Sequence, residues 1–231
     1  MTLSITELPD PAAVVFDLDG TLVDTNEARI EAWLETFREV AFRATRETLV
    51  PLIGLDGKRL AREVAALNAV VIDDHRAEEI DQRCGELFDQ RNTDPKPLPG
   101  VTALVDVIEA RDLPWSIATS SRKDQVGASV AALGLRNEPR IVDASHVEHA
   151  KPEPDLLLRA AEELGLDPAR CWYIGDSPWD MVASVAAAMI PIGVTTGAVV
   201  GRPQLEGAGA AAVVETLDEV AATLRERADR R

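Results

Sequence analysis

The chain has 231 residues, of which 46% are hydrophobic and 28% are charged, and its formal net charge is −16. This composition is typical of a globular protein and argues against a disordered chain. The negative charge disfavours general binding to nucleic acid or to an anionic membrane, so affinity for an anionic substrate would need local positive charge.

The two cysteines, Cys84 and Cys171, lie far apart in the sequence. We find neither a basic-then-apolar leader nor an apolar run of roughly 18 residues. We therefore expect a soluble, cytoplasmic protein in a reducing compartment, with both thiols buried rather than bridged.

Short apolar segments alternate with helical patterns, which is typical of a parallel sheet covered by helices. The predicted strands are Ala12–Phe16, Trp115–Ala118, Arg140–Val142, Cys171–Ile174, Ile190–Val194 and Ala211–Val214. Apolar residues at three- and four-residue steps predict the helices between them, for example Leu104 with Ile108 and Leu157 with Ala161. We expect an α/β fold with a doubly wound, Rossmann-like parallel sheet.

About ninety residues separate the first two of these strands, too many for a simple crossover. Four helical patterns occupy this segment, around residues 30–41, 49–53, 60–67 and 80–88. The stretch DPKPLPG at 94–100 reads as a stiff return linker. We predict an all-helical domain at 26–93, inserted into a core domain made of 1–25 and 94–231, with a charged terminal helix from about residue 215.

Polar side chains follow the predicted strands, where a doubly wound sheet binds its ligands. They are Asp17 and Asp19 after the first strand, Thr119, Ser120 and Ser121 after the second, Lys151 on a loop, Asp176 after the fourth strand, and then Asp180. Two carboxylates at the end of a buried strand need a compensating cation. Mg²⁺ takes hard oxygen ligands and usually keeps sites for water and phosphate. The set therefore suits phosphoryl transfer, with Thr119 and Lys151 holding phosphoryl oxygens.

Four ordered motifs carry a family resemblance: DLDGT at 17–21, the hydroxyl run at 119–121, Lys151 in KPEP, and GDSPWD at 175–180. They resemble the motifs of the haloacid dehalogenase (HAD) superfamily. The helical insert resembles its C1 cap, as in the phosphoglycolate phosphatase and β-phosphoglucomutase branch. The resemblance covers residues 14–194 and implies a phosphatase acting on a small phosphorylated metabolite.

The resemblance also implies individual roles. Asp17 would be the nucleophile that forms an aspartyl-phosphate, and Asp19 the acid that protonates the leaving group and later activates water. Thr119 and Ser120 would bind the phosphoryl group, and Lys151 would stabilise the nucleophile and the transferred charge. Lys58, Arg46 and Arg59 are candidate substrate contacts from the cap.

For the metal, the resemblance implies Mg²⁺ held by the Asp17 carboxylate, the backbone carbonyl of Asp19 and the side chain of Asp176. Asp180 would bind through water or orient the ligands from behind. The cap would close over the site, exclude water and select the leaving group.

Structural alternatives exist for these residues. Asp19 before glycine fits an ordinary turn, Asp176 fits a helix N-cap, and Thr119 or Ser121 fits a helix start. Lys151 fits a solvated loop. His146 and His149 are exposed loop residues more readily than metal ligands, and Cys84 belongs to an apolar helical stripe.

Three other functions are alternatives to the phosphatase. A sugar phosphomutase would use the same aspartyl-phosphate, but mutases of this branch commonly carry a histidine where this chain has Arg29 in RIEAW. Dehalogenation does not need Asp19, whose presence argues against it. Loss of Asp17, Asp19, Lys151 or Asp176 would favour a non-catalytic binding module, and all four are present. The substrate and the oligomeric state stay open.

Overall fold

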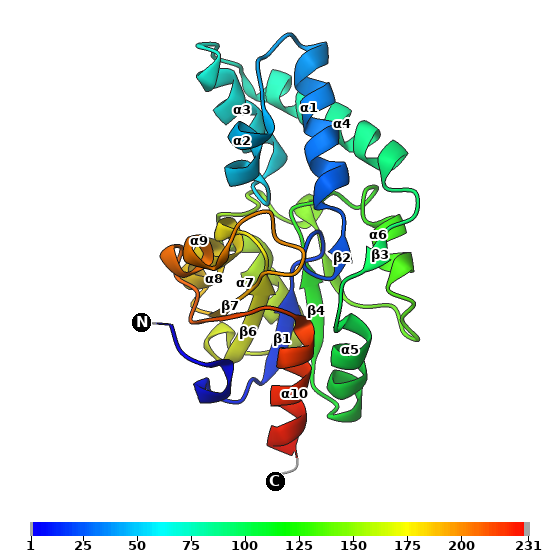
Figure 1. The fold of residues 1–231 in the computed structure, drawn as a ribbon, viewed down its shortest axis with the longest axis vertical. Helices are drawn as coiled ribbons and strands as arrows, with labels where there is room; N and C mark the ends of the chain where they lie inside the picture. The colour runs from blue at the N-terminus through cyan, green and yellow to red at the C-terminus, as the bar shows by residue number, and fades with distance from the viewer. Residues whose placement is uncertain (1, 229–231) are drawn as a thin grey trace.

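A six-stranded sheet forms the centre of the protein, whose computed structural model describes residues 2–228 (Figure 1). The strand order is β5-β4-β1-β6-β7-β8, and every neighbouring pair is parallel. The strands are β1 Ala13–Phe16, β4 Trp115–Ala118, β5 Ile141–Val142, β6 Cys171–Gly175, β7 Ile190–Val194 and β8 Ala212–Val214. All six predicted strands are present, and the predicted α/β class is confirmed.

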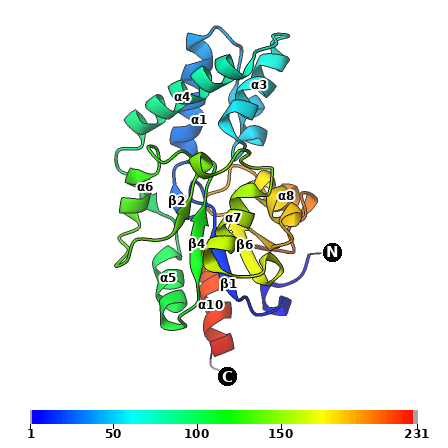
Figure 2. The same cartoon turned by 180° about the vertical axis from the view of Figure 1, so that it is seen from behind.

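Helices cover both faces of this sheet (Figures 1 and 2). Along β1, Val14 and Phe16 face one apolar cluster, and Ala13 and Val15 face the other, because successive side chains of a strand point to opposite sides. The first cluster includes α5 Val101–Ala110 and α10 Leu217–Ala228, and the second includes α7 Asp155–Leu164 and α8 Pro178–Ala186. The remaining elements of the core are α6 Gly127–Ala132, α9 Arg202–Gly207 and short 3₁₀ helices at Ile5–Glu7, Ala144–His146 and Pro168–Arg170.

The insert lies beyond the carboxyl ends of the strands, at the top of Figure 1. It contains α1 Asn26–Glu39, α2 Arg46–Leu49, a 3₁₀ turn Val50–Leu52, α3 Gly57–Leu67 and α4 Asp74–Arg91. These helices bury an apolar cluster of their own, centred on Phe37, Leu60 and Phe88. This separate cluster supports the proposed division at residues 26–93.

Two details differ from the sequence prediction. Helix α1 ends at Glu39, and Ala41, expected in the helix, adopts a left-handed φ of 58°. The return segment is more than a linker: its strand β3 Lys96–Pro97 pairs antiparallel with β2 Val23–Asp24. Proline has no N–H to donate, but the next residue continues the pairing, because the Leu98 N–H donates to the Leu22 carbonyl at 2.9 Å. The two connections to the insert therefore form one ribbon.

The terminal helix α10 ends at Ala228, and the rest of the predicted helix lies outside the described residues. Both cysteines are free and buried, as expected. Within residues 2–228, no helix has the length and apolar character needed to cross a membrane.

Candidate active site

Asp17 and Lys151 form a buried ion pair at the carboxyl edge of the sheet. Asp17 directly follows β1, and its N–H still donates to the carbonyl of Ile174 in the neighbouring strand at 2.9 Å. The Lys151 ammonium lies 2.6 Å from Asp17 Oδ1 and 2.7 Å from Asp180 Oδ1, with only 1% of its side chain exposed. Lys151 is therefore a positioned cation and not a solvated loop residue.

Asp180 fixes the position of Lys151 in this ion pair. Its Oδ1 accepts hydrogen bonds from Lys151 and from the Tyr173 hydroxyl, and its Oδ2 accepts from the backbone N–H and the hydroxyl of Ser177. Ser177 in turn caps α8 by accepting from the Asp180 N–H. Both carboxylate oxygens of Asp180 are thus engaged by protein donors, which fits the predicted orienting role.

Asp176 faces the same space from the end of β6. Its Oδ1 accepts from the Thr21 hydroxyl at 3.2 Å and its Oδ2 from the Asn26 amide at 2.7 Å. The N-cap of α8 is Ser177, so Asp176 is not the capping residue. Gly20 is required beside this carboxylate, because a Cβ at that position would lie 2.4 Å from Asp176 Oδ2 and the φ is +79°.

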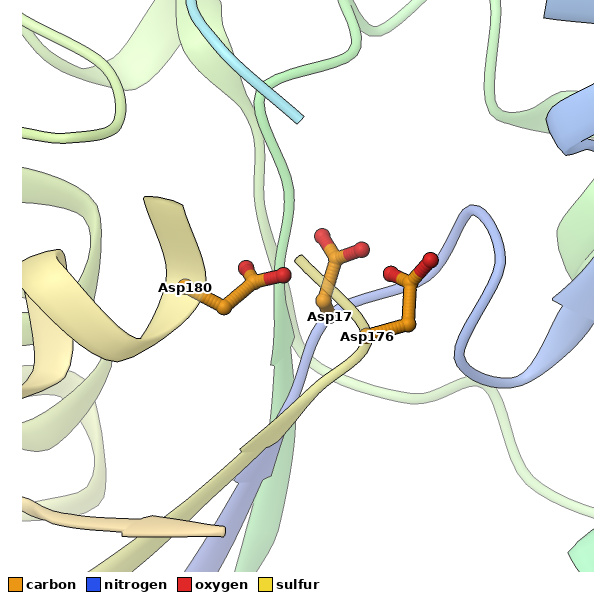
Figure 3. A group of neighbouring side chains, drawn as sticks. All are labelled: Asp17, Asp176 and Asp180. Atoms are coloured by element: carbon orange, nitrogen blue, oxygen red, sulfur yellow. The ribbon is translucent and has the colours of Figure 1, made fainter. Parts of the chain in front are cut away.

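Figure 3 shows Asp17 between Asp176 and Asp180, with oxygens from all three directed into one space. One oxygen from each lies within 4.8 Å of the others. Burial raises the pKa of Asp17 well above its ordinary value, although the Lys151 charge opposes this. Burial, reinforced by the Asp180 charge, raises the pKa of Asp176 to about 7. Although burial disfavours its charged form, the charges of Asp17 and Asp180 raise the pKa of Lys151.

Three carboxylates and the single ammonium of Lys151 give this buried site a formal excess of negative charge. Three hard carboxylates around one space are the donor set that Mg²⁺ prefers, and a divalent cation would supply the missing charge. The residues therefore fit the metal. The predicted contribution of Asp19 is a backbone carbonyl, and it stays a prediction.

Asp19 belongs to a separate pair beside this cluster. Its Oδ1 accepts from the Thr25 hydroxyl at 2.8 Å, and its Oδ2 accepts from Arg29 Nη2 at 3.2 Å and from the Ser121 hydroxyl. Thr25 directly precedes the insert, Arg29 lies in its first helix, and Ser121 comes from the loop after β4. Ser121 thus contacts Asp19 and does not cap a helix.

Thr119 and Ser120 lie where the sequence predicts, directly after β4. Thr119 is buried, and its hydroxyl accepts from the Ser121 N–H at 3.1 Å. The Ser120 hydroxyl donates to the carbonyl of Gly54 in the insert at 3.5 Å. This loop therefore contacts both Asp19 and the insert.

Most of the predicted residues meet in a small pocket of about 60 Å³. Among its lining residues are Asp17, Asp19, Thr119, Ser120, Lys151 and Asp176, together with Arg29, Trp33 and Leu60 of the insert. A wider groove of about 880 Å³ lies next to it, and Asp81, Ser120 and Gln125 line both. The groove offers room for a group larger than the cavity holds.

Other candidates lie elsewhere. Lys58 lines the wider groove, 4.0 Å from Glu78, and does not line the small cavity. Arg46 and Arg59 pair with Glu27 and Glu153 at exposed positions. The histidines pair locally, His146 with Asp143 and His149 with Asp155, and Cys84 lies in the insert's apolar cluster.

Sequence reasoning missed several residues of the network, namely Thr21, Thr25, Asn26, Arg29, Gln125 and Tyr173. The first three follow the DLDG turn so closely that their nearness to Asp19 was a usable signal. Arg29 stood out only as a departure from the mutase pattern. In the sequence, Tyr173 is distinguished only as part of a buried strand, and Gln125 only as a polar residue just before a helix.

Comparison with known proteins places this geometry in a family. Residues 14–194 match the family model described as haloacid dehalogenase-like hydrolase. The chain belongs to this family. The resemblance inferred from the four motifs is thereby confirmed, and the chain is assigned to a family of hydrolases.

Two curated relatives are phosphatases from Escherichia coli (strain K12). Fructose-1-phosphate phosphatase YqaB is 31% identical over 183 residues, which cover 77% of this chain and 93% of that protein. Hexitol phosphatase A is 30% identical over 218 residues, covering 93% and 95%. The crystal structure of a hydrolase from Pseudomonas syringae superposes with a TM-score of 0.87 at 30% identity, over 93% of this chain and 98% of that one.

Proposed function

We propose that this family member is a cytoplasmic, Mg²⁺-dependent phosphatase that hydrolyses phosphate esters of small sugars or polyols through an aspartyl-phosphate on Asp17. One observation carries the proposal: Asp17 is ion-paired with buried Lys151 in a small pocket that Asp19 and Asp176 also line. The phosphatases to which the chain is similar support the substrate class.

In the proposed first step, a carboxylate oxygen of Asp17 attacks phosphorus, and the bond between phosphorus and the ester oxygen breaks. The electron pair goes to the leaving oxygen, which takes a proton from the carboxyl group of Asp19. In the second step, the Asp19 carboxylate removes a proton from water, which attacks the phosphorus of the aspartyl-phosphate. Phosphate leaves and the Asp17 carboxylate is restored.

Lys151 and the loop after β4 hold the transferring group. The ammonium keeps Asp17 in place and offsets negative charge on the phosphoryl oxygens. Thr119 and Ser120 offer hydroxyls to these oxygens from the cavity wall. Asp180 acts through Lys151, because it fixes the position of the ammonium.

The residues that would hold Mg²⁺ are Asp17, Asp176 and the backbone carbonyl of Asp19, with Asp180 behind them. When bound, the ion supplies positive charge that screens the attacking carboxylate from the phosphate dianion. Thr21 and Asn26 hold Asp176 in place at this space.

We further propose that the insert acts as a cap. The pocket of about 60 Å³ has room for a phosphoryl group and little more. The sugar part of a substrate must therefore extend into the groove past Asp81 and Gln125, or it can enter only when the insert moves away from the core. Closure also excludes bulk water from the site.

The test is phosphate release from 4-nitrophenyl phosphate and from a panel of sugar and polyol phosphates, with Mg²⁺ and with EDTA. Wild type should be active only with the metal, and Asp17→Asn should lower kcat by about four orders of magnitude or more. Asp106→Asn, an exposed change on α5, serves as the matched control and should have no effect. Activity indifferent to both the metal and Asp17→Asn would support the non-catalytic module instead.

The products of the reaction distinguish a phosphomutase from a phosphatase. Arg29 stands where the mutases of this branch commonly carry histidine, which favours hydrolysis. Isomerisation of a sugar phosphate primed by a bisphosphate, without steady phosphate release, would reverse that choice.

A further inference from the structure

The Arg29 side chain contacts three parts of the molecule: the turn that holds Asp19, the loop after β4, and helix α4 of the insert. Its Nη2 lies 3.2 Å from Asp19 Oδ2 and 2.8 Å from the Ser121 hydroxyl oxygen, and its Nη1 lies 3.4 Å from Gln125 Oε1. Its Cζ lies 3.4 Å from the ring centroid of Phe88 in α4. The guanidinium thus stacks on the insert while it donates to two segments of the core.

The hydrogen bonds around Asp19 have one consistent direction. Because Arg29 donates to the Ser121 oxygen, the Ser121 hydroxyl proton is free to be donated to Asp19 Oδ2. Thr25 donates to the other oxygen. Both oxygens of Asp19 are therefore held, and the plane of the carboxylate is fixed relative to the cavity.

Arg29 is the ion-pair partner of Asp19 among the residues that the structure describes, and only 14% of each side chain is exposed. Both terminal nitrogens of the guanidinium are engaged by protein acceptors, which suits an orienting role better than substrate binding. An arginine also keeps its protons throughout the pH range in which enzymes work, so these donors persist.

The contact depends on where the insert lies. Arg29 belongs to α1 and Phe88 to α4, both in the insert, whereas Asp19 and Ser121 belong to the core. If the insert moves away, the guanidinium moves with it, so Asp19 loses its ion pair and Ser121 loses the donor that orients its hydroxyl toward Asp19. The Asp19 carboxyl group is therefore aligned by Arg29 only while the insert is docked on the core.

From these contacts we infer that Arg29 is a positioning residue that aligns the Asp19 carboxyl group with the leaving oxygen when the insert is docked. The inference deepens the proposed phosphatase function and rests on it. Asp19 matters most for leaving groups that need protonation, so loss of Arg29 should harm the departure of basic alcohols far more than that of acidic ones.

Phenyl phosphate and 4-nitrophenyl phosphate provide the test, because their leaving groups have similar shape and differ in basicity. kcat/KM is compared, since it is insensitive to the later hydrolysis of the aspartyl-phosphate. Arg29→Gln should lower kcat/KM for phenyl phosphate about 100-fold and for 4-nitrophenyl phosphate no more than about threefold. Arg29→Lys, which keeps a donor and the charge, should recover about a tenth or more of the phenyl phosphate activity.

Arg83→Gln is the matched control, because the ion-pair partners of Arg83 among the described residues are Glu39 and Glu86, both within the insert. It should change neither rate by more than about twofold. Thermal melts check that the variants fold. If Arg29→Gln does not fold, Ser121→Ala removes the hydroxyl link while keeping the charge, and it should raise the dependence on leaving-group basicity in the same direction.

Equal losses on both substrates would overturn the inference, because a merely structural role predicts them. So would full activity of Arg29→Gln on phenyl phosphate. If wild type releases phosphate from neither substrate, the proposed function itself fails, and this outcome is distinct because it appears without any substitution.

Discussion

Replacement of Asp176 by asparagine should stabilise the metal-free protein at alkaline pH. Burial and the nearby Asp180 raise the pKa of Asp176 from an ordinary 3.8 to about 7. Because each pKa unit corresponds to about 1.4 kcal/mol, ionised Asp176 destabilises the metal-free fold by about 4 kcal/mol at pH 8. Asparagine removes the charge, but its single side-chain oxygen must replace two acceptors used by Thr21 and Asn26, which costs about 1–3 kcal/mol. The expected net gain is about 1–3 kcal/mol.

The sign of the pH dependence follows from the raised pKa. The folded state holds the Asp176 proton more tightly than the unfolded state does, so this contribution to stability is complete below about pH 4 and is lost as the pH rises through 7. The advantage of Asp176→Asn over wild type should therefore grow by about 2 kcal/mol or more between pH 5 and pH 8.

Urea unfolding in EDTA at these two pH values measures the difference, with Asp106→Asn as the control. Added Mg²⁺ at about 100 times its dissociation constant should stabilise wild type by about 2.7 kcal/mol and leave the variant almost unchanged. The order of stability should then invert or the gap should close. An advantage of the variant that is no larger at pH 8 than at pH 5 would refute the reasoning.

Three further substitutions test neighbouring parts of the site. Tyr173→Phe removes a hydroxyl from the buried carboxylate network and should lower the free energy of unfolding by about 1 kcal/mol in urea titrations; an unchanged value would mean that the hydroxyl makes no net contribution. Gly54→Ala should lower kcat/KM at least about tenfold, because φ is +94° and its Cβ would lie 2.4 Å from Ser177 Oγ across the interface with the insert; unaltered kinetics would show that this approach is not needed for closure. Arg122→Gln removes the cation that pairs with Asp81 of α4 at the rim of the cavity and should speed amide hydrogen exchange in α4 several-fold; unchanged exchange would show that the pair does not hold the insert closed.

The sheet and its acidic edge could be predicted because their signals are local. The apolar, β-branched composition of β1 predicts a buried strand, and Asp17 follows this strand directly. The topological rule for doubly wound sheets then brings the ends of β1, β4 and β6 to one edge, where the structure places Thr119 and Asp176 as well.

The network around the acids could not be predicted in the same way. Arg29 and Ser121 are 92 residues apart, and Asn26 and Asp176 are 150 apart. Hydrophobic periodicity reports which face of a helix is buried and does not report which polar residue from a distant segment meets it. The β2–β3 ribbon was missed for a related reason, since strands of two residues containing proline give no alternation to detect.

The charged residues of the site form two groups, of which one is electrically neutral and the other carries excess negative charge. Asp19 and Arg29 balance each other, so the acid pair is complete without a metal. Asp17, Asp176 and Asp180 share the single charge of Lys151, which leaves a formal excess of two negative charges in a buried space. A phosphate dianion would be repelled from that cluster until a divalent cation cancels the excess. If the proposed Mg²⁺ dependence holds in this chain of net charge −16, attraction for substrate depends on a bound divalent cation and a few positioned cationic side chains, and removal of the metal should abolish phosphate binding as well as catalysis.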